Sequence, residues 1–111
     1  MENLSKKKCE PCEGGVEPLS REQFEVYLDQ VQEWLFTHND TRMEREYQFK
    51  DFKEALDFVN RTGVIAEDEG HHPNIYIHSW NKVKITLYTH AIGGLSINDF
   101  VVAVKIDQLL K

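Results

Sequence analysis

The run IYIHSWNKVKITL, residues 75–87, decides the fold class, because apolar and polar residues alternate on both sides of a polar break. In the segments 75–77 and 83–87, aliphatic residues occupy every second position, so their side chains lie on one face of an extended chain. Such alternation is typical of half-buried strands. Residues 80–82 separate the two segments, so the sequence predicts two neighbouring strands.

A second pair of strands is expected further upstream. Residues 34–36 are apolar, and residues 43–49 alternate, with Met43, Arg45, Tyr47 and Phe49 on one side. The polar residues 38–41 between the two segments are typical of a turn. The sequence therefore predicts a second hairpin.

Helix starts are marked by three capping-box patterns, in which a Ser or Asp is followed three residues later by a polar partner. The patterns are Ser20 with Gln23, Asp51 with Glu54 and Ser96 with Asp99. The middle helix is expected to end at Gly70, since glycine is common just after a helix. Its apolar stripe is expected to comprise Phe52, Ala55, Leu56, Val59 and Ala66.

The expected order is α-β-β-α-β-β-α. Hairpins joined by helices favour an α+β two-layer domain, with a four-stranded antiparallel sheet and helices packed on one face. Residues 1–18 contain glycine and proline without a periodic apolar pattern, which predicts a flexible tail in which little can pack. Residues 19–111 are expected to form a single domain.

The composition limits the classes of function. The chain has 111 residues, a net charge of −6 and 41% hydrophobic residues, which indicates a globular protein. The acidic charge disfavours binding to nucleic acid. Neither a membrane-length apolar run nor a signal peptide is found, so a cytoplasmic location is expected. Cys9 and Cys12 are interpreted as part of an exposed, reduced tail rather than as a zinc or redox site.

His71 and His72, followed by Pro73, allow three interpretations. Histidine cations are stabilised at a helix C-terminus, which would explain them structurally. A metal site would need three or four ligands, drawn from His71, His72, His90 and Glu67. Neighbouring residues of an extended chain point apart, which disfavours this set as a metal site.

The third interpretation is acid–base catalysis, since histidine exchanges protons near neutral pH. Glu67 lies four residues before His71, so the two could share a helical face and Glu67 could orient His71. His90 is expected at a strand end on the polar face, a common place for site residues. His38 and His78 are interpreted as surface residues. The residues alone thus predict a cofactor-free site that moves protons on an already reactive substrate.

These positions together resemble the signature of the pterin-4a-carbinolamine dehydratases. The signature positions are Glu67, His71, His72, Pro73, Trp80, His90 and Asp99. Residues 9–15, CEPCEGG, are similar to the N-termini of bacterial-type members. The resemblance covers nearly the whole chain.

The resemblance implies dehydration of a 4a-hydroxytetrahydropterin to a quinonoid dihydropterin, without metal or cofactor. It implies that His71 and His90 transfer protons, without assigning which is the acid, and that His72 mainly binds the pterin. It also implies supporting or substrate-binding roles for Glu67, Trp80 and Asp99. For Asp99, helix capping is the alternative explanation.

The resemblance further implies a homodimer or homotetramer that recycles the pterin of aromatic amino acid hydroxylases. Two alternatives follow from known relatives: a protein-interaction module that acts as dimerisation cofactor of a transcription regulator, and a pterin-binding assembly factor. The presence of all three signature histidines favours the enzyme.

Overall fold

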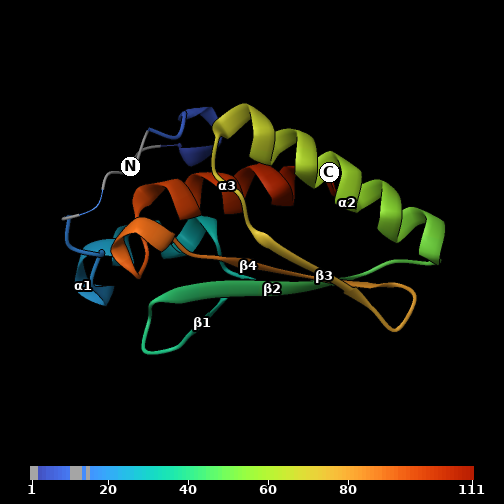
Figure 1. Cartoon of the computed structure of the whole chain (residues 1–111), viewed down its shortest axis with the longest axis horizontal. Coiled ribbons are helices and arrows are strands. Elements are labelled where there is room, and N and C mark those ends of the chain that lie inside the picture. The colour runs from blue at the N-terminus through green and yellow to red at the C-terminus, as the bar shows by residue number, and fades with distance from the viewer. Residues whose placement is uncertain (1–2, 11–13, 15) are drawn as a thin grey trace.

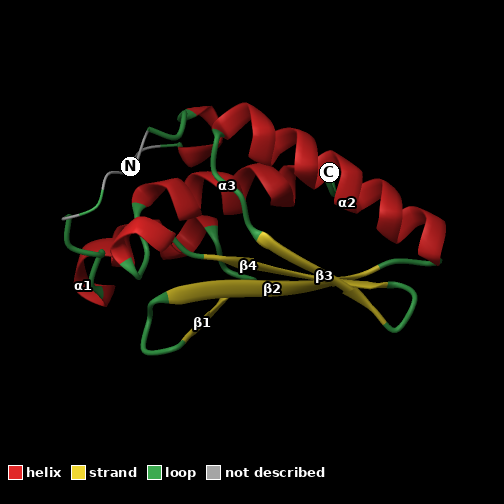
Figure 2. Ribbon diagram, viewed as in Figure 1, coloured by secondary structure: helices red, strands yellow, loops and turns green. Residues whose placement is uncertain are grey.

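The computed structural model describes residues 3–10, 14 and 16–111 as a two-layer α+β structure (Figures 1 and 2). Its elements are η1 (Leu4–Lys6), α1 (Arg21–Phe24), η2 (Glu25–Gln30), β1 (Leu35–Thr37), β2 (Arg42–Gln48), α2 (Phe52–Glu69), β3 (Asn74–His78), β4 (Lys82–Leu87), η3 (His90–Ile92) and α3 (Ile97–Gln108), where η marks a 3-10 helix. None of the helices described is long and apolar enough to cross a membrane.

The four strands form one antiparallel sheet in the order β1-β2-β4-β3. The two long helices, α2 and α3, lie on the same face of this sheet (Figure 2). The predicted fold class is therefore confirmed. The alternation also holds, since Met43, Val83 and Ile85 are fully buried beneath the helices.

The first helix begins at its predicted capping box but soon changes its geometry. Ser20 and Gln23 form the expected capping box, but the α-helix ends at Phe24 and continues as 3-10 helix η2. In a 3-10 helix, residues three apart lie one above the other. This brings both Phe24 and Tyr27 onto the ring of Phe100, each with a centroid distance of 5.4 Å.

Helix α2 buries only part of the predicted stripe. Its buried residues are Ala55, Phe58, Thr62 and Ala66. Phe58 packs against the rings of Tyr47 and Phe49 at 4.7 and 4.9 Å. Phe58, which was not in the predicted stripe, therefore faces the core, whereas Phe52 and Leu56 of that stripe are exposed. The capping box at Asp51 is half formed, since Asp51 accepts the Glu54 N–H but Glu54 accepts from Lys50.

The C-terminal end of α3 is tied to the sheet through Asp107. Its carboxylate accepts hydrogen bonds from Trp34 Nε1 at 2.9 Å, Arg45 at 2.8 Å and the Tyr47 hydroxyl at 2.7 Å. Burial, followed by the nearby Asp107 charge, strongly raises the pKa of Tyr47, which keeps the phenol protonated.

The expectation that little of residues 1–18 packs is wrong. Leu4 is fully buried and belongs to the main core, and Cys9 packs against that core. The Leu4 N–H donates to Gln30 Oε1 at 3.0 Å. In Figure 1 this segment, in blue, lies beside the C-terminal end of α2 and the start of α3. One apolar residue in a polar segment has no periodicity, so the sequence pattern did not reveal it.

Candidate active site

His71, His72 and His90 line one pocket, with a volume of about 380 Å³. The topology explains why they meet. Residues 71–73 precede β3 and residues 88–90 follow β4. Because β3 and β4 are antiparallel, with Asn74 opposite Thr86, the start of one strand lies beside the end of the other. The pocket is completed by Gly70, Pro73, Asn74, Tyr88 and Thr89.

Gly70 ends α2 as predicted and turns the chain towards the pocket. It has the left-handed φ of 65°, and its N–H donates to Ala66 O. A residue with a Cβ is strained in this conformation. The His71 N–H donates to the same carbonyl, Ala66 O, at 3.2 Å. His71 therefore leaves the helix axis and lies over the start of α3.

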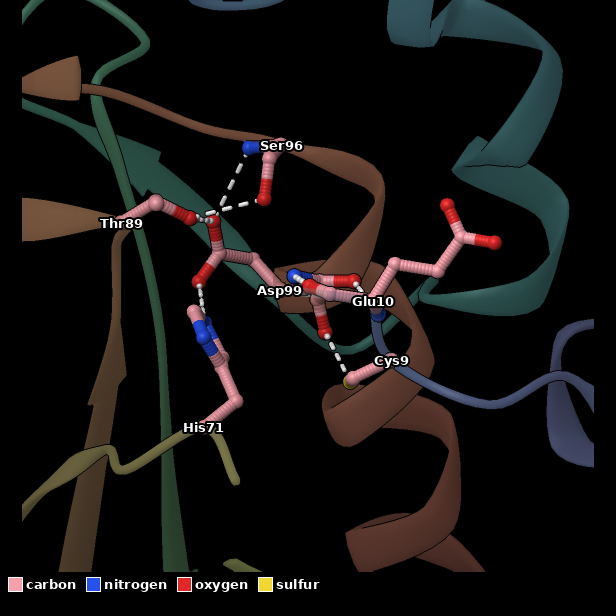
Figure 3. A network of polar contacts seen from close by, with 7 residues as sticks. Cys9, Glu10, His71, Thr89, Ser96 and Asp99 are labelled. Carbon is pink, nitrogen blue, oxygen red and sulfur yellow. Dashed lines mark hydrogen bonds and ion pairs between the residues drawn. The ribbon is translucent and has the colours of Figure 1, made fainter. Parts of the chain in front are cut away.

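His71 Nε2 lies 2.6 Å from Asp99 Oδ1 (Figure 3). Asp99 is fully buried, and the His71 side chain is 11% exposed. Asp99 also forms the predicted capping box with Ser96, so capping and contact with His71 are both served by one carboxylate.

The second oxygen of Asp99 is held by two donors (Figure 3). Oδ2 accepts from the Thr89 hydroxyl at 2.8 Å and from the Ser96 N–H at 3.0 Å. The Thr89 and Ser96 hydroxyls are also 2.8 Å apart. Buried polar groups in a satisfied network hold a single geometry. Thr89 was not singled out from the sequence as a site residue, since a threonine near a strand end carries no signal of its own.

The contact with Asp99 fixes which nitrogen of neutral His71 carries the proton. An ionised carboxylate only accepts hydrogen bonds, so Nε2 must be the donor. The lone pair of neutral His71 is then on Nδ1. The same logic orients a histidine that serves as a general base.

Glu67 contacts His72 rather than His71, contrary to the expected pairing. His72 Nε2 and Glu67 Oε2 are in contact, with side chains 61% and 77% exposed. The left-handed Gly70 interrupts the helix before His71, so the spacing of four residues no longer places Glu67 beside it. An exposed pair of this kind contributes little to stability. Of the two residues, His72 lines the pocket.

His90 begins η3 and is exposed beside Tyr88. The two rings have a centroid distance of 4.2 Å. The Arg42 guanidinium lies 4.5 Å from the centre of the Tyr88 ring. Tyr88 therefore forms a wall of the pocket and supports His90. The alternation of β4 places Tyr88 on the open face of the sheet, and this was the available signal in the sequence.

Trp80 is not brought to the pocket within this chain. It lies in the turn between β3 and β4, at the end of the hairpin opposite the histidines, and is 60% exposed. Ser79 and Trp80 both have positive φ there. His78, at the same end, contacts Glu46 on the open face of the sheet. His38 lies in the β1–β2 turn with positive φ.

Cys9 is partly buried, which corrects the expectation of an exposed cysteine. Burial, together with the charge and hydrogen bonding of Glu69, raises the pKa of the Cys9 thiol to about 12. A protonated thiol is a poor nucleophile and metal ligand. Cys12 lies outside the described residues. Within residues 3–10, 14 and 16–111, no group of three or more His, Cys, Asp or Glu side chains could hold a metal ion.

Comparison with known proteins agrees with the resemblance seen in the sequence. Residues 17–109 match the family model described as pterin 4 alpha carbinolamine dehydratase. A protein of Alkaliphilus metalliredigens named "Putative pterin-4-alpha-carbinolamine dehydratase" is 52% identical over 97% of this chain and 96% of its own. The mitochondrial pterin-4-alpha-carbinolamine dehydratase 2 of Arabidopsis thaliana is 43% identical over 98% of this chain and 60% of its own.

A solved structure shows the same fold. The crystal structure of a transcriptional coactivator/pterin dehydratase from Brucella melitensis superposes with a TM-score of 0.77 at 26% identity, covering 86% of this chain and 100% of the other. The histidine pocket, the matched family model and the near full-length relatives lead to one conclusion: the chain belongs to the pterin-4a-carbinolamine dehydratase family.

Proposed function

We propose that this chain removes water from a 4a-hydroxytetrahydropterin to give the quinonoid dihydropterin, with His71 and His90 as the proton-transfer pair. One observation carries the proposal. Both histidines line the same pocket, and His71 is oriented there by the fully buried Asp99. The family membership supplies the substrate class.

His71 is the base in this proposal. Its Nδ1 takes the proton from ring nitrogen N5, while the electrons of the N5–H bond form the new C4a=N5 double bond. The imidazolium that results carries protons on both nitrogens, and Asp99 stabilises it through Nε2. The reason for choosing His71 is that Asp99 holds Nε2 as the donor, which leaves the lone pair of Nδ1 to accept a proton.

His90 is the acid. It donates a proton to the 4a-hydroxyl as the C4a–O bond breaks, so the oxygen leaves as water. One proton enters and one leaves, and the balance needs no oxidant, reductant or metal. The exchange of a proton between the two imidazoles and solvent restores both groups, because both are accessible from the pocket.

His72 and Glu67 are proposed to hold the pterin at the pocket. Their side chains are the exposed pair beside it. A pterin ring presents amide and amine groups, so a paired imidazole and carboxylate offer both a donor and an acceptor. This proposal gives His72 a binding role rather than a proton-transfer role.

We also propose that the protein works in the cytoplasm as a homodimer or homotetramer and recycles the pterin of an aromatic amino acid hydroxylase. Exposed apolar residues on α2, namely Phe52, Leu56 and Val64, support self-association. Light scattering after size-exclusion chromatography measures the mass directly. A monomer at micromolar concentration would contradict the oligomer.

The activity is tested with chemically prepared 4a-hydroxytetrahydropterin, followed by absorbance in a stopped-flow instrument. The wild-type chain should accelerate dehydration well above the spontaneous rate, which must be subtracted. His71→Ala should lose that acceleration. His78→Ala is the matched control, because His78 also contacts a carboxylate but lies outside the pocket. A folded wild-type chain without acceleration would contradict the enzyme and favour a protein-interaction role.

A further inference from the structure

The backbone of Cys9 and Glu10 is hydrogen-bonded to α2, which ends two residues before His71, and to α3, which carries Asp99. We infer that residues 9 and 10, with Glu69 and Asn98 as positioning residues, hold these helices in register and thereby align His71 with Asp99. The inference rests on the proposed function and adds to it a positioning device outside the pocket. We call Cys9, Glu10, Glu69 and Asn98 the N-terminal clamp.

The first half of the clamp fixes the end of α2. The Cys9 N–H donates to Glu69 Oε1 at 2.8 Å. The second carboxylate oxygen of Glu69 accepts from Lys105 Nζ of α3 at 2.6 Å. The Glu69 side chain is only 4% exposed. Glu69 is the last residue of α2 and stands two residues before His71, so it fixes the point from which His71 departs.

The charge of Glu69 is compensated in this position. Burial by itself would raise the pKa of Glu69, but the hydrogen bonds from Lys105 and Cys9, with the charges of Lys105 and Lys8, outweigh it and lower the pKa. Glu69 is therefore ionised at neutral pH. An ionised, buried acceptor makes stronger hydrogen bonds than a neutral one.

The second half of the clamp fixes the start of α3. Asn98 Oδ1 accepts from the Glu10 N–H at 3.0 Å, and Asn98 Nδ2 donates to Glu10 O at 2.6 Å. The Cys9 thiol approaches Asn98 O at 3.6 Å. Asn98 is 5% exposed and immediately precedes Asp99. Figure 3 shows Cys9 and Glu10 beside the helix that carries Asp99.

The two halves of the clamp are joined directly, because Cys9 and Glu10 are neighbours in the sequence. A shift of α2 against α3 would have to break hydrogen bonds at Cys9, at Glu10 or at Lys105. The 2.6 Å contact between His71 and Asp99 joins the segment just after α2 to α3. None of the four clamp residues lines the pocket, so the clamp acts through the alignment of His71 and not through the substrate.

The test compares Asn98→Ala with the wild-type chain. We expect kcat to fall by about tenfold, within the roughly 10²-fold loss that a misplacement of about 1 Å can cause. KM should stay nearly constant, since the pterin contacts remain. In ¹⁵N NMR spectra, a smaller fraction of neutral His71 should carry its proton on Nε2. Glu69→Gln retains an oxygen acceptor for the Cys9 N–H and should show a smaller change in the same direction.

Two control variants separate positioning from general loss of stability. Glu10→Ala keeps both backbone hydrogen bonds to Asn98, so kcat and the His71 tautomer should match wild type. Val31→Ala removes buried methyl groups outside the clamp and the pocket. It should lower the melting temperature without changing kcat at a temperature where it is folded.

The inference is wrong if His71 has the wild-type tautomer in both Asn98→Ala and Glu69→Gln, and if the kcat of both variants equals that of the control Val31→Ala. Should Asn98→Ala not fold, Asn98→Asp decides, because it keeps the acceptor for the Glu10 N–H and loses only the donor. The NMR measurement uses no substrate. It therefore tests the clamp even if the wild-type chain proves inactive, which would contradict the proposed function alone.

Discussion

At the scale of single residues, the two oxygens of Asp99 serve different partners. Oδ1 contacts His71, and Oδ2 caps α3 through Ser96 and accepts from Thr89. The cap fixes the carboxylate before any substrate is present. The orientation of His71 is therefore a consequence of how α3 begins.

Asp99→Asn should separate these two functions. The asparagine side-chain oxygen can still accept from the Ser96 N–H in the capping box, so the free energy of unfolding should change by only about 1 kcal/mol. The amide can present N–H to His71, which would move the imidazole proton from Nε2 to Nδ1 and remove the base. We expect kcat to fall by about 10²-fold or more, measured beside the unfolding transition. Unchanged kcat in the folded variant would remove Asp99 from the mechanism.

The three pocket histidines should differ in kind. His71→Ala and His90→Ala should each lower kcat by about 10²–10⁴-fold, the usual contribution of a positioned acid or base. His72→Ala should mainly raise KM, because a contact made equally in ground and transition states does not affect kcat.

The double variant of His71 and His90 is the sharper measurement. Two groups that act in one elimination are not independent, so the double loss should be smaller than the product of the single losses. Fully multiplicative losses would show that the two histidines act in separate steps.

At the scale of elements, the glycine inside α2 and the glycine that ends this helix have opposite roles. Gly70 has φ 65°, whereas Gly63 lies inside the helix, and a Cβ at either position meets no atom within 4 Å. Gly70→Ala should therefore destabilise the fold by about 1–2 kcal/mol through backbone strain alone. Gly63→Ala should stabilise it by about 0.5–1 kcal/mol through helix propensity. Urea denaturation of both variants measures the two changes in the free energy of unfolding. If both changes had the same sign, the assignment of the helix end would be contradicted.

The elements also show what the sequence could reveal. Local signals worked: the strand alternation, the Ser20 and Ser96 capping boxes and the Gly70 helix end are all present in the structure. The burial of Phe58 was not predicted. It depends on contacts with the rings of Tyr47 and Phe49, and the sequence of α2 alone contains no information about these contacts. The same limit applies to Thr89, whose importance comes from a carboxylate ten residues away.

At the scale of the whole molecule, the N-terminal segment is part of the core. Leu4→Ala should reduce the free energy of unfolding by about 2–5 kcal/mol, the usual loss for a buried leucine. Val16→Ala, at a side chain that is 62% exposed, should change it by less than about 0.5 kcal/mol. Thermal or urea unfolding distinguishes the two. If both substitutions changed the free energy of unfolding by equally small amounts, residues 1–18 would have to be regarded as a tail that does not pack.

The buried Glu69 predicts how stability depends on pH. Its pKa in the folded protein is lower than its ordinary value of 4.5. The carboxylate therefore contributes stability that is fully present above about pH 4.5 and is lost as the pH falls through the folded pKa. Glu69→Gln should be less stable than wild type near neutral pH, and the difference should shrink in acid. A difference that does not change with pH would show that the carboxylate is not ionised in the native state.

The buried Trp34, which donates a hydrogen bond to Asp107 of α3, gives the molecule an intrinsic fluorescence probe. The chain has two tryptophans; Trp34 is 4% exposed and Trp80 is 60% exposed. The emission of an indole shifts to longer wavelength in water, so unfolding should red-shift Trp34 and leave Trp80 nearly unchanged. In a Trp80→Phe background, the fluorescence would report only whether the C-terminal end of α3 is docked on the sheet. Comparing its loss with the far-ultraviolet dichroism would show whether that end detaches before the rest of the fold.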